Sequence, residues 1–238
     1  MSAVKPYTAD GSKREQVERM FDSISPKYDL LNRLLSFGTD QGWRRKVMRS
    51  VGQENVRELL DVATGTADLA IMAAKQVDRV TGADISEGML GFGREKVKKA
   101  GLSSRVELVR GDAADLPFAD NRFDAITVAF GVRNFEDLDR GVRGMLRVLK
   151  PNGRLFVLEF SKPHGWMRPF FHFYFHRIMP AIGRLVSKDS AAYTYLPASV
   201  DAFPEGPAFV AILRNCGGRE VTSRSLTGGI ATLYIARK

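Results

Sequence analysis

The feature that most constrains the fold is a regular alternation of strand-like and helix-like segments. Apolar, strand-like runs lie at 57–62, 79–83, 105–109, 123–130 and 153–160, and helical patterns at 67–76, 86–100 and 135–149. Strands that alternate with helices through short loops are typical of a parallel sheet covered on both faces. The apolar centres of the first and fourth runs fit strands that are buried on both sides.

Two further strands close the predicted sheet. The runs at 219–225 and 230–236 follow each other across Thr227-Gly228-Gly229, which favours a hairpin. We therefore predict an α/β fold with a seven-stranded Rossmann-like sheet, six strands parallel and one antiparallel, and helices on both faces. Helical spacing over 14–37, broken at Ser25-Pro26, adds two N-terminal helices. Thr39 or Asp40 is expected to cap a third helix, which runs through Ser50.

The turn after the first strand, "DVATGTAD", has the position of a nucleotide-binding loop but only one glycine, Gly65. A dinucleotide fold uses G-x-G-x-x-G so that a pyrophosphate reaches the helix N-terminus, whereas Ala63 and Ala67 stand in this turn. Flanking acids, Asp61 and Asp68, place negative charge beside it. The turn therefore suits a cofactor with a cationic end and no phosphate.

Two more acids stand at the ends of neighbouring strands. Asp84 ends the second strand, 19 residues after Gly65, where an acid accepts hydrogen bonds from ribose hydroxyls. Asp112 ends the third strand, within reach of an adenine amino group. Taken singly, Asp84 and Asp112 are also plausible helix N-caps. The ordered set of acids favours a nucleoside without phosphates, and S-adenosylmethionine fits.

Longer motifs carry a resemblance over nearly the whole chain. They are "FDSISPKYDLLNRLLSFGTDQGWRRK" (21–46), "DVATGTADLA" (61–70), "ADISEGML" (83–90), "AADLPFADNRFDAITVAFGVRNFEDL" (113–138) and "RVLKPNGRLFVLEFSKP" (147–163). The chain resembles class I S-adenosylmethionine-dependent methyltransferases, and among them the demethylmenaquinone (menaquinone/ubiquinone biosynthesis) C-methyltransferase family. The "FGVRN" and "LEFSKP" blocks are the family-specific part. The resemblance implies C-methylation of a polyprenyl quinol, with S-adenosylmethionine as the cofactor.

The resemblance also implies a set of cofactor-binding residues. Gly65 and Thr66 would line the methionine part, Asp84 would hold the ribose, and Asp112 and Ala113 would flank the adenine.

Three more positions complete that set. Ala129, at the end of the fourth strand, stands where many relatives have serine, and Asp61 belongs to the loop. Tyr28 is expected to close over the cofactor, with a core tyrosine as the alternative.

Arg133 and Asn134 of "FGVRN" are the predicted catalytic residues. Loss of a phenolic proton makes the adjacent ring carbon of a quinol nucleophilic, and a free phenol has a pKa of about 10. Because a guanidinium stays protonated, Arg133 is expected to stabilise the phenolate or to orient a water molecule. Asn134 is expected to orient Arg133. The alternative for Arg133 is a structural ion pair with one of three acids: Glu136, Asp137 or Asp68.

The resemblance and the loops divide the chain into four segments. Residues 1–52 form an arm and helices that cover the cofactor site, and 53–162 form the cofactor-binding core. An aromatic-rich substrate cap, 163–204, is inserted before a C-terminal helix and hairpin at 205–238. The alternative for 163–204 is an ordinary subdomain core.

Charge gives a further expectation about the cap. The chain carries a net charge of +9, and the stretch 140–188 holds ten Lys/Arg side chains against one acid, Glu159. Aromatic residues beside cations suit an anionic lipid surface, so we expect peripheral, salt-sensitive membrane contact, to which Arg140, Arg143 and Arg147 add. A solvated surface without a partner is the alternative. His172 and His176 share a helix face, and we favour packing over metal binding for them.

Other features complete the expectations. Cys216 is the only cysteine, and the N-terminus shows no apolar signal segment, so we expect a cytoplasmic protein, peripheral at the inner face of the membrane. We expect no metal and no nucleic-acid partner, and a homo-oligomer is possible. A related methyltransferase of a benzoquinol, another small molecule or RNA, and a non-catalytic nucleoside-binding module, stay open as alternatives.

Overall fold

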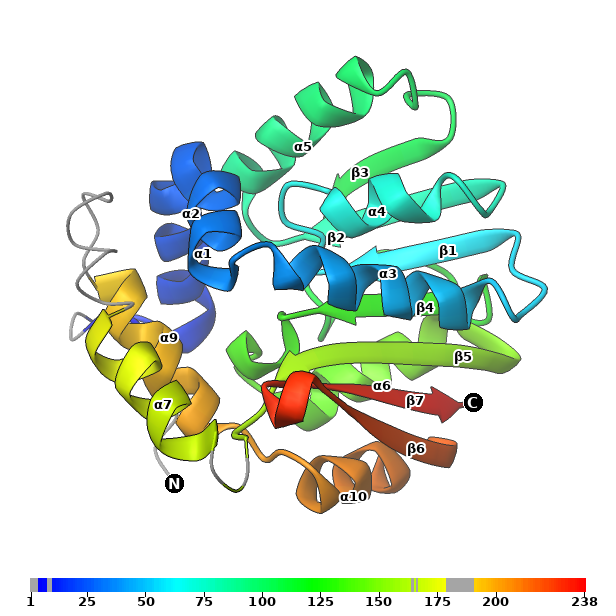
Figure 1. Cartoon of the computed structure of the whole chain (residues 1–238). Coiled ribbons are helices and arrows are strands. Elements are labelled where there is room, and N and C mark those ends of the chain that lie inside the picture. Colours follow the sequence, from blue (N-terminus) through cyan, green and yellow to red (C-terminus); the bar gives the residue numbers. More distant parts are fainter. Residues whose placement is uncertain (1–3, 8–9, 164, 166, 179–190) are drawn as a thin grey trace.

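The computed structural model describes residues 4–7, 10–163, 165, 167–178 and 191–238. A seven-stranded sheet forms its centre, in the order β3-β2-β1-β4-β5-β7-β6 (Figure 1). The strands are β1 Glu58–Val62, β2 Arg79–Asp84, β3 Val106–Arg110, β4 Phe123–Ala129, β5 Leu149–Phe160, β6 Arg219–Leu226 and β7 Ala231–Arg237.

The strand directions confirm the predicted fold class. The five strands β3, β2, β1, β4 and β5 pair in parallel, and β7 is antiparallel to both β5 and β6. The strand boundaries agree with the prediction to within one residue, with one exception. β5 begins at Leu149, four residues before the predicted start, because Leu149 pairs with Phe123 across an irregularity in the ladder.

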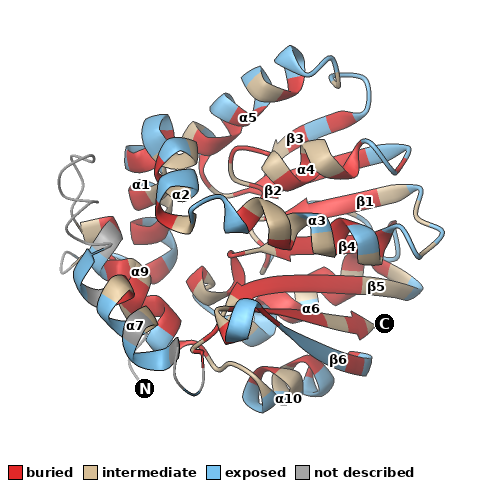
Figure 2. Ribbon diagram, viewed as in Figure 1, coloured by how far each residue is buried: buried red, intermediate tan, exposed pale blue. Residues whose placement is uncertain are grey.

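Helices cover both faces of the sheet, as the strand–helix alternation predicted. α3 Thr39–Val51, α4 Asp68–Ala73 and α5 Glu87–Lys99 pack with residues such as Leu59 in one cluster. α6 Leu138–Val148 and α10 Pro207–Asn215 pack with residues such as Leu60 in the second. Neighbouring residues of one strand point to opposite faces, which separates the two clusters. Figure 2 shows β1, β2, β4 and β7 buried along most of their length, whereas β6 at the edge of the sheet is mostly exposed.

The N-terminal helices break where the sequence predicted. α1 Lys13–Ile24 starts with a capping box between Ser12 and Glu15, and the turn η1 Ser25–Lys27 carries Pro26 before α2 Tyr28–Ser36. The predicted cap of the third helix is wrong. Gly38, in a left-handed conformation, is the N-cap of α3, because the Thr39 hydroxyl donates back to the Ser36 carbonyl.

The aromatic segment lies against these N-terminal helices. It contains α7 Met167–Phe173, the π-helical turn η3 Tyr174–Ile178 and α9 Ala191–Ala202 (Figure 1). Side chains of η3 and α9, Phe175 and Tyr195 among them, share a third buried cluster with Leu31 of α2. Two 3-10 turns, η2 Val132–Asn134 and η4 Thr227–Gly229, follow β4 and β6.

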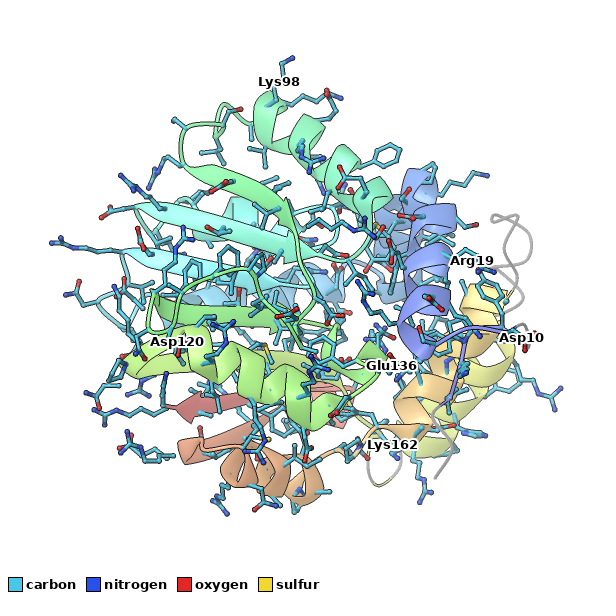
Figure 3. All side chains as sticks on the ribbon, turned by 180° about the vertical axis from the view of Figure 1, so that it is seen from behind. Asp10, Arg19, Lys98, Asp120, Glu136 and Lys162 are labelled. Atoms are coloured by element: carbon cyan, nitrogen blue, oxygen red, sulfur yellow. The ribbon has the colours of Figure 1, made fainter. Side chains whose placement is uncertain are left out.

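In the described part of the basic stretch, the cations do not form one continuous patch. Arg147 pairs with Asp120, and Figure 3 shows Asp120 at the end of the molecule away from α1 and α9. Lys150 pairs with Asp124 and Arg154 with Glu54. These cations therefore neutralise acids along the sheet. Arg147 in particular does not add to a surface formed by α7 and α9.

Within the described residues, no helix is long and apolar enough to cross a membrane. The described part of the chain also contains no group of three or more His, Cys, Asp or Glu side chains placed to hold a metal ion. His172 is exposed, and the side chain of His176 lies outside the described part.

Candidate active site

Two cavities meet at the carboxyl ends of the parallel strands. The larger cavity, of about 600 Å³, lies over the ends of β1, β2 and β4. The second, which we call the apolar cavity, has a volume of about 390 Å³ and lies among α1, α2, η3 and α9. Four residues line both cavities: Phe21, Tyr28, Phe130 and Asn134. A group bound in one cavity therefore adjoins a group bound in the other.

The loop after β1 has a glycine-type backbone although it contains one glycine. Ala63, Gly65 and Ala67 all have a left-handed conformation, with φ of 52°, 57° and 66°. A side chain at such a φ is strained, so two alanines occupy positions that glycine would adopt freely. Phe130 at the end of β4 is also left-handed, with φ of 61°. Backbone strain of this kind clusters at functional sites.

Asp84 connects the loop to the end of β2. Its Oδ2 accepts a hydrogen bond from the Gly65 amide at 2.8 Å, and its Oδ1 accepts one from the Ser86 amide at 2.9 Å. Burial raises the pKa of Asp84 to about 6, against the effect of these hydrogen bonds. Gly65 and Asp84 both line the larger cavity. A ribose contact for Asp84 and a methionine contact for Gly65 stay predictions.

Asp112 lies at the next strand end and faces the N-terminal segment. Its Oδ2 is 2.7 Å from Nε of Arg14 on α1, and its Oδ1 accepts a hydrogen bond from the Ala114 amide at 2.9 Å. Asp112, Ala113 and Ala129 all line the larger cavity. Arg14 was missing from the predicted site, because only tertiary packing brings α1 over β3.

Two predicted cofactor residues lie behind the wall of this cavity. Asp61 accepts hydrogen bonds from the hydroxyls of Thr64 and Thr127, both at 2.7 Å, and lines neither cavity. Thr66 is buried, and its hydroxyl donates to Asp29 at 2.6 Å. Both residues support the loop from within, and a direct cofactor contact stays a prediction for them.

A charged network joins the loop to α2. Lys96 of α5 lies 2.7 Å from Asp29 of α2 and donates to the Thr66 hydroxyl at 3.1 Å. Lys96 also pairs with Asp68, and this pairing lowers the pKa of Asp68 against the effect of its burial. The network connects the helix that borders the apolar cavity to the loop that borders the larger one.

Arg133 lies at the polar end of the apolar cavity. Its guanidinium is 2.8 Å from Glu159 and also donates to the Phe130 carbonyl. The Glu159 side chain has no exposed surface, and it also accepts a hydrogen bond from the Phe160 amide at 2.8 Å. None of the three acids named from the sequence pairs with Arg133. Glu136 instead accepts the backbone N–H of Lys13, near the start of α6 (Figure 3).

Sequence reasoning missed Glu159, Arg44 and Tyr195. Glu159 had a signal, since it is the one acid in the basic stretch and stands inside an apolar strand. Arg44 of α3 packs over the Phe130 ring at 5.5 Å, and Arg133 packs over the Phe160 ring at 5.4 Å. Arg44 lies in the family motif 21–46, but nothing in that motif singles it out, and Tyr195 had no signal in the sequence. Helices far apart in the chain bring both residues to the cavity.

Tyr28 occupies the boundary between the cavities. Burial raises the pKa of its hydroxyl, against the charges of Arg44 and Arg133. The hydroxyl is therefore protonated at neutral pH. Tyr28 lies next to the loop, since a Cβ added at Gly65 would lie 3.9 Å from the tyrosine ring. That Tyr28 closes over the cofactor stays a prediction.

Comparison with known families decides the class of the protein. The profile of the ubiE/COQ5 methyltransferase family matches residues 9–238. The chain belongs to this family. A demethylmenaquinone methyltransferase of Bacteroides fragilis is 50% identical over 99% of this chain and 97% of its own. Another, from Porphyromonas gingivalis, is 41% identical, covering 99% of this chain and 98% of its own.

A further family member gives the same class with a broader name. The ubiquinone/menaquinone biosynthesis C-methyltransferase UbiE of Geotalea daltonii is 43% identical over 95% of this chain and 97% of its own. These matches confirm the resemblance drawn from "FGVRN" and "LEFSKP" and the methyltransferase class that it implied.

Solved structures confirm the fold. A phosphoethanolamine N-methyltransferase 2 of Haemonchus contortus, in complex with S-adenosyl-L-methionine, superposes with a TM-score of 0.70 at 16% identity, over 97% of this chain and 60% of its own. A SAM-dependent methyltransferase of Thermotoga maritima gives a TM-score of 0.64 at 15% identity, over 92% of this chain and 99% of its own. At such identities the likeness shows the fold alone.

Proposed function

We propose that this member of the ubiE/COQ5 family transfers a methyl group from S-adenosylmethionine to a ring carbon of a demethylmenaquinol. The observation that carries the proposal is the junction of the two cavities at Asn134. At this junction, the acid-lined cavity at the strand ends adjoins the apolar cavity, which contains a buried arginine. A polar cofactor and an apolar, ionisable substrate each find a complementary site, and they meet at one wall.

The residues of the larger cavity fit the cofactor. Asp84 would accept hydrogen bonds from the ribose hydroxyls, and Asp112 and Ala113 would flank the adenine. Gly65, Ala129 and Tyr28 line the space in which the amino-acid part would lie. When bound, S-adenosylmethionine supplies an electrophilic methyl group on a cationic sulfur.

The chain's own residues then prepare the quinol. An ionised quinol hydroxyl raises the electron density of the neighbouring ring carbon, which becomes the nucleophile. Arg133 stabilises the phenolate by its charge, because a guanidinium does not accept a proton. Glu159 holds Arg133 in place. Its Oε1 accepts from the Arg133 guanidinium and the Phe160 amide and its Oε2 from the Arg133 amide, so it acts as a positioning residue. Apolar walls exclude water, which strengthens these charge interactions.

The apolar cavity favours a quinol over RNA. Base-methylating enzymes read a flipped base by polar contacts to its edge. Most of the walls here are aliphatic and aromatic, with Leu31, Leu35, Phe171 and Phe175 among them. A benzoquinol with a prenyl tail meets the same requirements, so it is the second candidate substrate.

Methyl transfer in solution tests the proposal. The purified protein is incubated with a short-chain demethylmenaquinol, S-adenosylmethionine and a reductant, and the products are identified by mass spectrometry. We expect a product heavier by one methyl group on the ring carbon, and none when the reductant is omitted. Transfer to RNA, or cofactor binding without transfer to either quinol, would contradict it.

We also propose that the protein contacts the membrane through one surface, which we call the α2 patch. Its exposed apolar residues are Leu30, Leu34, Phe37, Phe173 and Ile178. Leu30 and Leu34 share one face of α2. The Phe37 ring lies 5.9 Å from the Tyr174 ring, which joins α2 to η3.

The position of the α2 patch and the charges beside it favour a bilayer as the occupant. Phe37 and Tyr174 also line the apolar cavity, so a prenyl tail could pass from lipid into the site. Arg33 and Arg177 are exposed beside the patch, which suits anionic headgroups.

Flotation with vesicles of phosphatidylglycerol and phosphatidylcholine tests this surface. We expect binding at low salt that weakens at high salt and is lost in Leu34→Glu. Phe92→Glu, which changes an exposed phenylalanine of α5 outside the patch, should bind as the wild type does. No flotation at low salt, or a dimer that Leu34→Glu dissociates, would overturn the proposal.

A further inference from the structure

Four buried polar atoms without a hydrogen-bond partner gather around the apolar cavity. They are Nε of Arg133, Oδ1 of Asn134, the hydroxyl of Tyr195 and Nε of Arg44, which faces the Asp40 carboxylate at 3.6 Å, beyond hydrogen-bond distance. Among the residues that the structure describes, no other buried side-chain nitrogen or oxygen lacks a partner, and all four residues line this one cavity. Folded proteins rarely leave buried polar atoms unpaired, so their concentration in one cavity indicates a ligand that pairs with them.

The surrounding contacts fix how two of these atoms are presented. Glu159 and the Phe130 carbonyl hold one end of the Arg133 guanidinium, which leaves its Nε available. The Asn134 amide nitrogen lies 3.5 Å from the same carbonyl, so the amide oxygen points elsewhere. A flipped amide would place two oxygens against each other.

Tyr195 joins this group from a separate helix. α9, which carries it, packs against η2, which carries Arg133 and Asn134. Burial raises the pKa of Tyr195 to about 12, and the charges of Arg133 and Glu159 act on it in opposite directions. The hydroxyl therefore stays protonated near neutral pH and is able to donate a hydrogen bond.

We propose that Tyr195 is a catalytic residue that donates a hydrogen bond to the ionising oxygen of the aromatic substrate, beside Nε of Arg133. Before ionisation, Oδ1 of Asn134 accepts a hydrogen bond from the hydroxyl of the substrate. The released proton passes to the buffer, since neither the guanidinium nor a protonated tyrosine accepts it. The assignment rests on the proposed function and adds a phenolate-binding subsite whose donors come from both η2 and the cap.

Tyr174 provides the matched control within the same cavity. It also lines the apolar cavity, but its hydroxyl donates to the Leu35 carbonyl at 2.8 Å. Removing the hydroxyl of Tyr174 breaks an internal hydrogen bond, whereas removing that of Tyr195 breaks none. We therefore expect Tyr174→Phe to lower the melting temperature and Tyr195→Phe to leave it unchanged or raise it.

The experiment measures the ionisation of 1-naphthol, a phenol that needs no reductant, bound with S-adenosylhomocysteine. Absorbance follows naphtholate formation against pH in the wild type, Tyr195→Phe and Tyr174→Phe. Loss of a hydrogen bond to a charged oxygen should raise the bound naphthol pKa by about one unit in Tyr195→Phe. Tyr174→Phe should match the wild type.

The groups that face the bound phenol must be constant across this comparison. They are Tyr28, Asp40 with Arg44, Arg133 with Glu159, and Tyr195 itself. Because the two Phe variants remove only hydroxyls, the charges of this set are the same in all three proteins.

Three results would overturn the subsite: an unchanged naphthol pKa in Tyr195→Phe, an equal shift in Tyr174→Phe, or no binding of 1-naphthol to the wild type. With the quinol, Tyr195→Phe should lower kcat about tenfold at pH 7 and recover at higher pH. A Tyr195-dependent naphthol pKa without quinol methylation would refute the proposed function and leave the subsite standing.

Discussion

The Arg133 guanidinium lies 2.8 Å from the Glu159 carboxylate, and the two residues come from different elements, η2 and β5. Glu159 has no exposed surface and Arg133 has 8% of its side chain exposed. A buried pair of this kind contributes little net stability, but it holds both charges in defined positions. Here it presents Nε of Arg133 to the cavity in which we place the substrate.

Glu159→Gln tests the positioning role. Removing one charge of a buried pair leaves the other uncompensated, so the free energy of unfolding should fall by about 3 kcal/mol. The kcat should fall as well, because Arg133 loses its orientation. Urea unfolding and steady-state kinetics measure the two effects.

Glu220→Gln is the matched control. Glu220 pairs with Arg237 at the same distance, 2.8 Å, but on the surface. In Glu220→Gln the free energy of unfolding should fall by less than about 1 kcal/mol, and kcat should be unchanged. Equal losses in the two variants would count against a special role for Glu159.

Arg133→Ala should lower kcat by about 10²–10³-fold, the usual effect of removing a donor that stabilises an oxyanion. Cofactor Kd, measured by calorimetry, should stay close to the wild-type value, because Arg133 does not line the larger cavity. Arg133→Lys, which keeps the charge, should retain more activity. A large loss of cofactor binding would refute the assignment of Arg133 to the substrate.

Asp84→Asn should weaken cofactor binding by about ten- to a hundredfold, since an amide accepts fewer hydrogen bonds from two hydroxyls than a carboxylate does. The pKa of Asp84, raised to about 6, adds a pH dependence. In the wild type the cofactor Kd should rise as the pH falls through about 6, where the carboxylate becomes protonated. In Asp84→Asn that part of the pH dependence should be absent. Asp115→Asn, at another acid of the same cavity, should bind normally.

Asp61→Asn should change how stability depends on pH. Burial raises the pKa of Asp61 to about 6, from an ordinary 3.8. The folded state therefore holds this proton more tightly, and its stabilising effect is complete below about 3.8 and lost as the pH rises through 6. The shift corresponds to about 3 kcal/mol.

Unfolding in urea at pH 4 and pH 8 measures this change. Asp61→Asn should lose less stability over the interval than the wild type. Asp124→Asn is the control of opposite sign, since the hydrogen bonds of Lys150 and two amides lower the pKa of Asp124 despite its burial. The contribution of Asp124 is present above about pH 3.8 and is lost on further acidification, so Asp124→Asn should change the pH dependence little between pH 4 and pH 8. Parallel pH curves for Asp61→Asn and the wild type would contradict the expectation.

Ala63→Gly should stabilise the protein by about 0.5–1 kcal/mol. The left-handed conformation costs an L-residue about 1–2 kcal/mol, and the greater chain entropy of glycine in the unfolded state offsets part of the gain. Thermal unfolding measures the difference. Gly65→Ala is the converse change. Its added Cβ would meet only the Tyr28 ring, at 3.9 Å, so any decrease in the free energy of unfolding would reflect backbone strain. A destabilised Ala63→Gly would show that the alanine side chain matters more than its φ.

Much of the architecture could be predicted because it depends on local patterns. Period-two and helical spacing located every strand of the sheet. The ends of β1, β2 and β3 lie at one edge of a parallel sheet, which placed Gly65, Asp84 and Asp112 together. The "FGVRN" motif located Arg133 and Asn134 just past β4. These inferences use neighbours in sequence or a regular geometry that repeats.

The remaining features depend on contacts between distant parts of the chain. Glu159 is 26 positions from its partner Arg133. Arg14, Arg44 and Tyr195 reach the cavities on helices whose docking no spacing encodes. The alanines of "DVATGTAD" have the backbone of glycine, because the surrounding strands and α4 determine the course of the loop. The sequence by itself determined the sheet and the class of cofactor, since both follow from periodicity and order along the chain. Only the tertiary structure decided the polar partners of the substrate cavity, since burial and charge pairing arise between elements far apart in sequence.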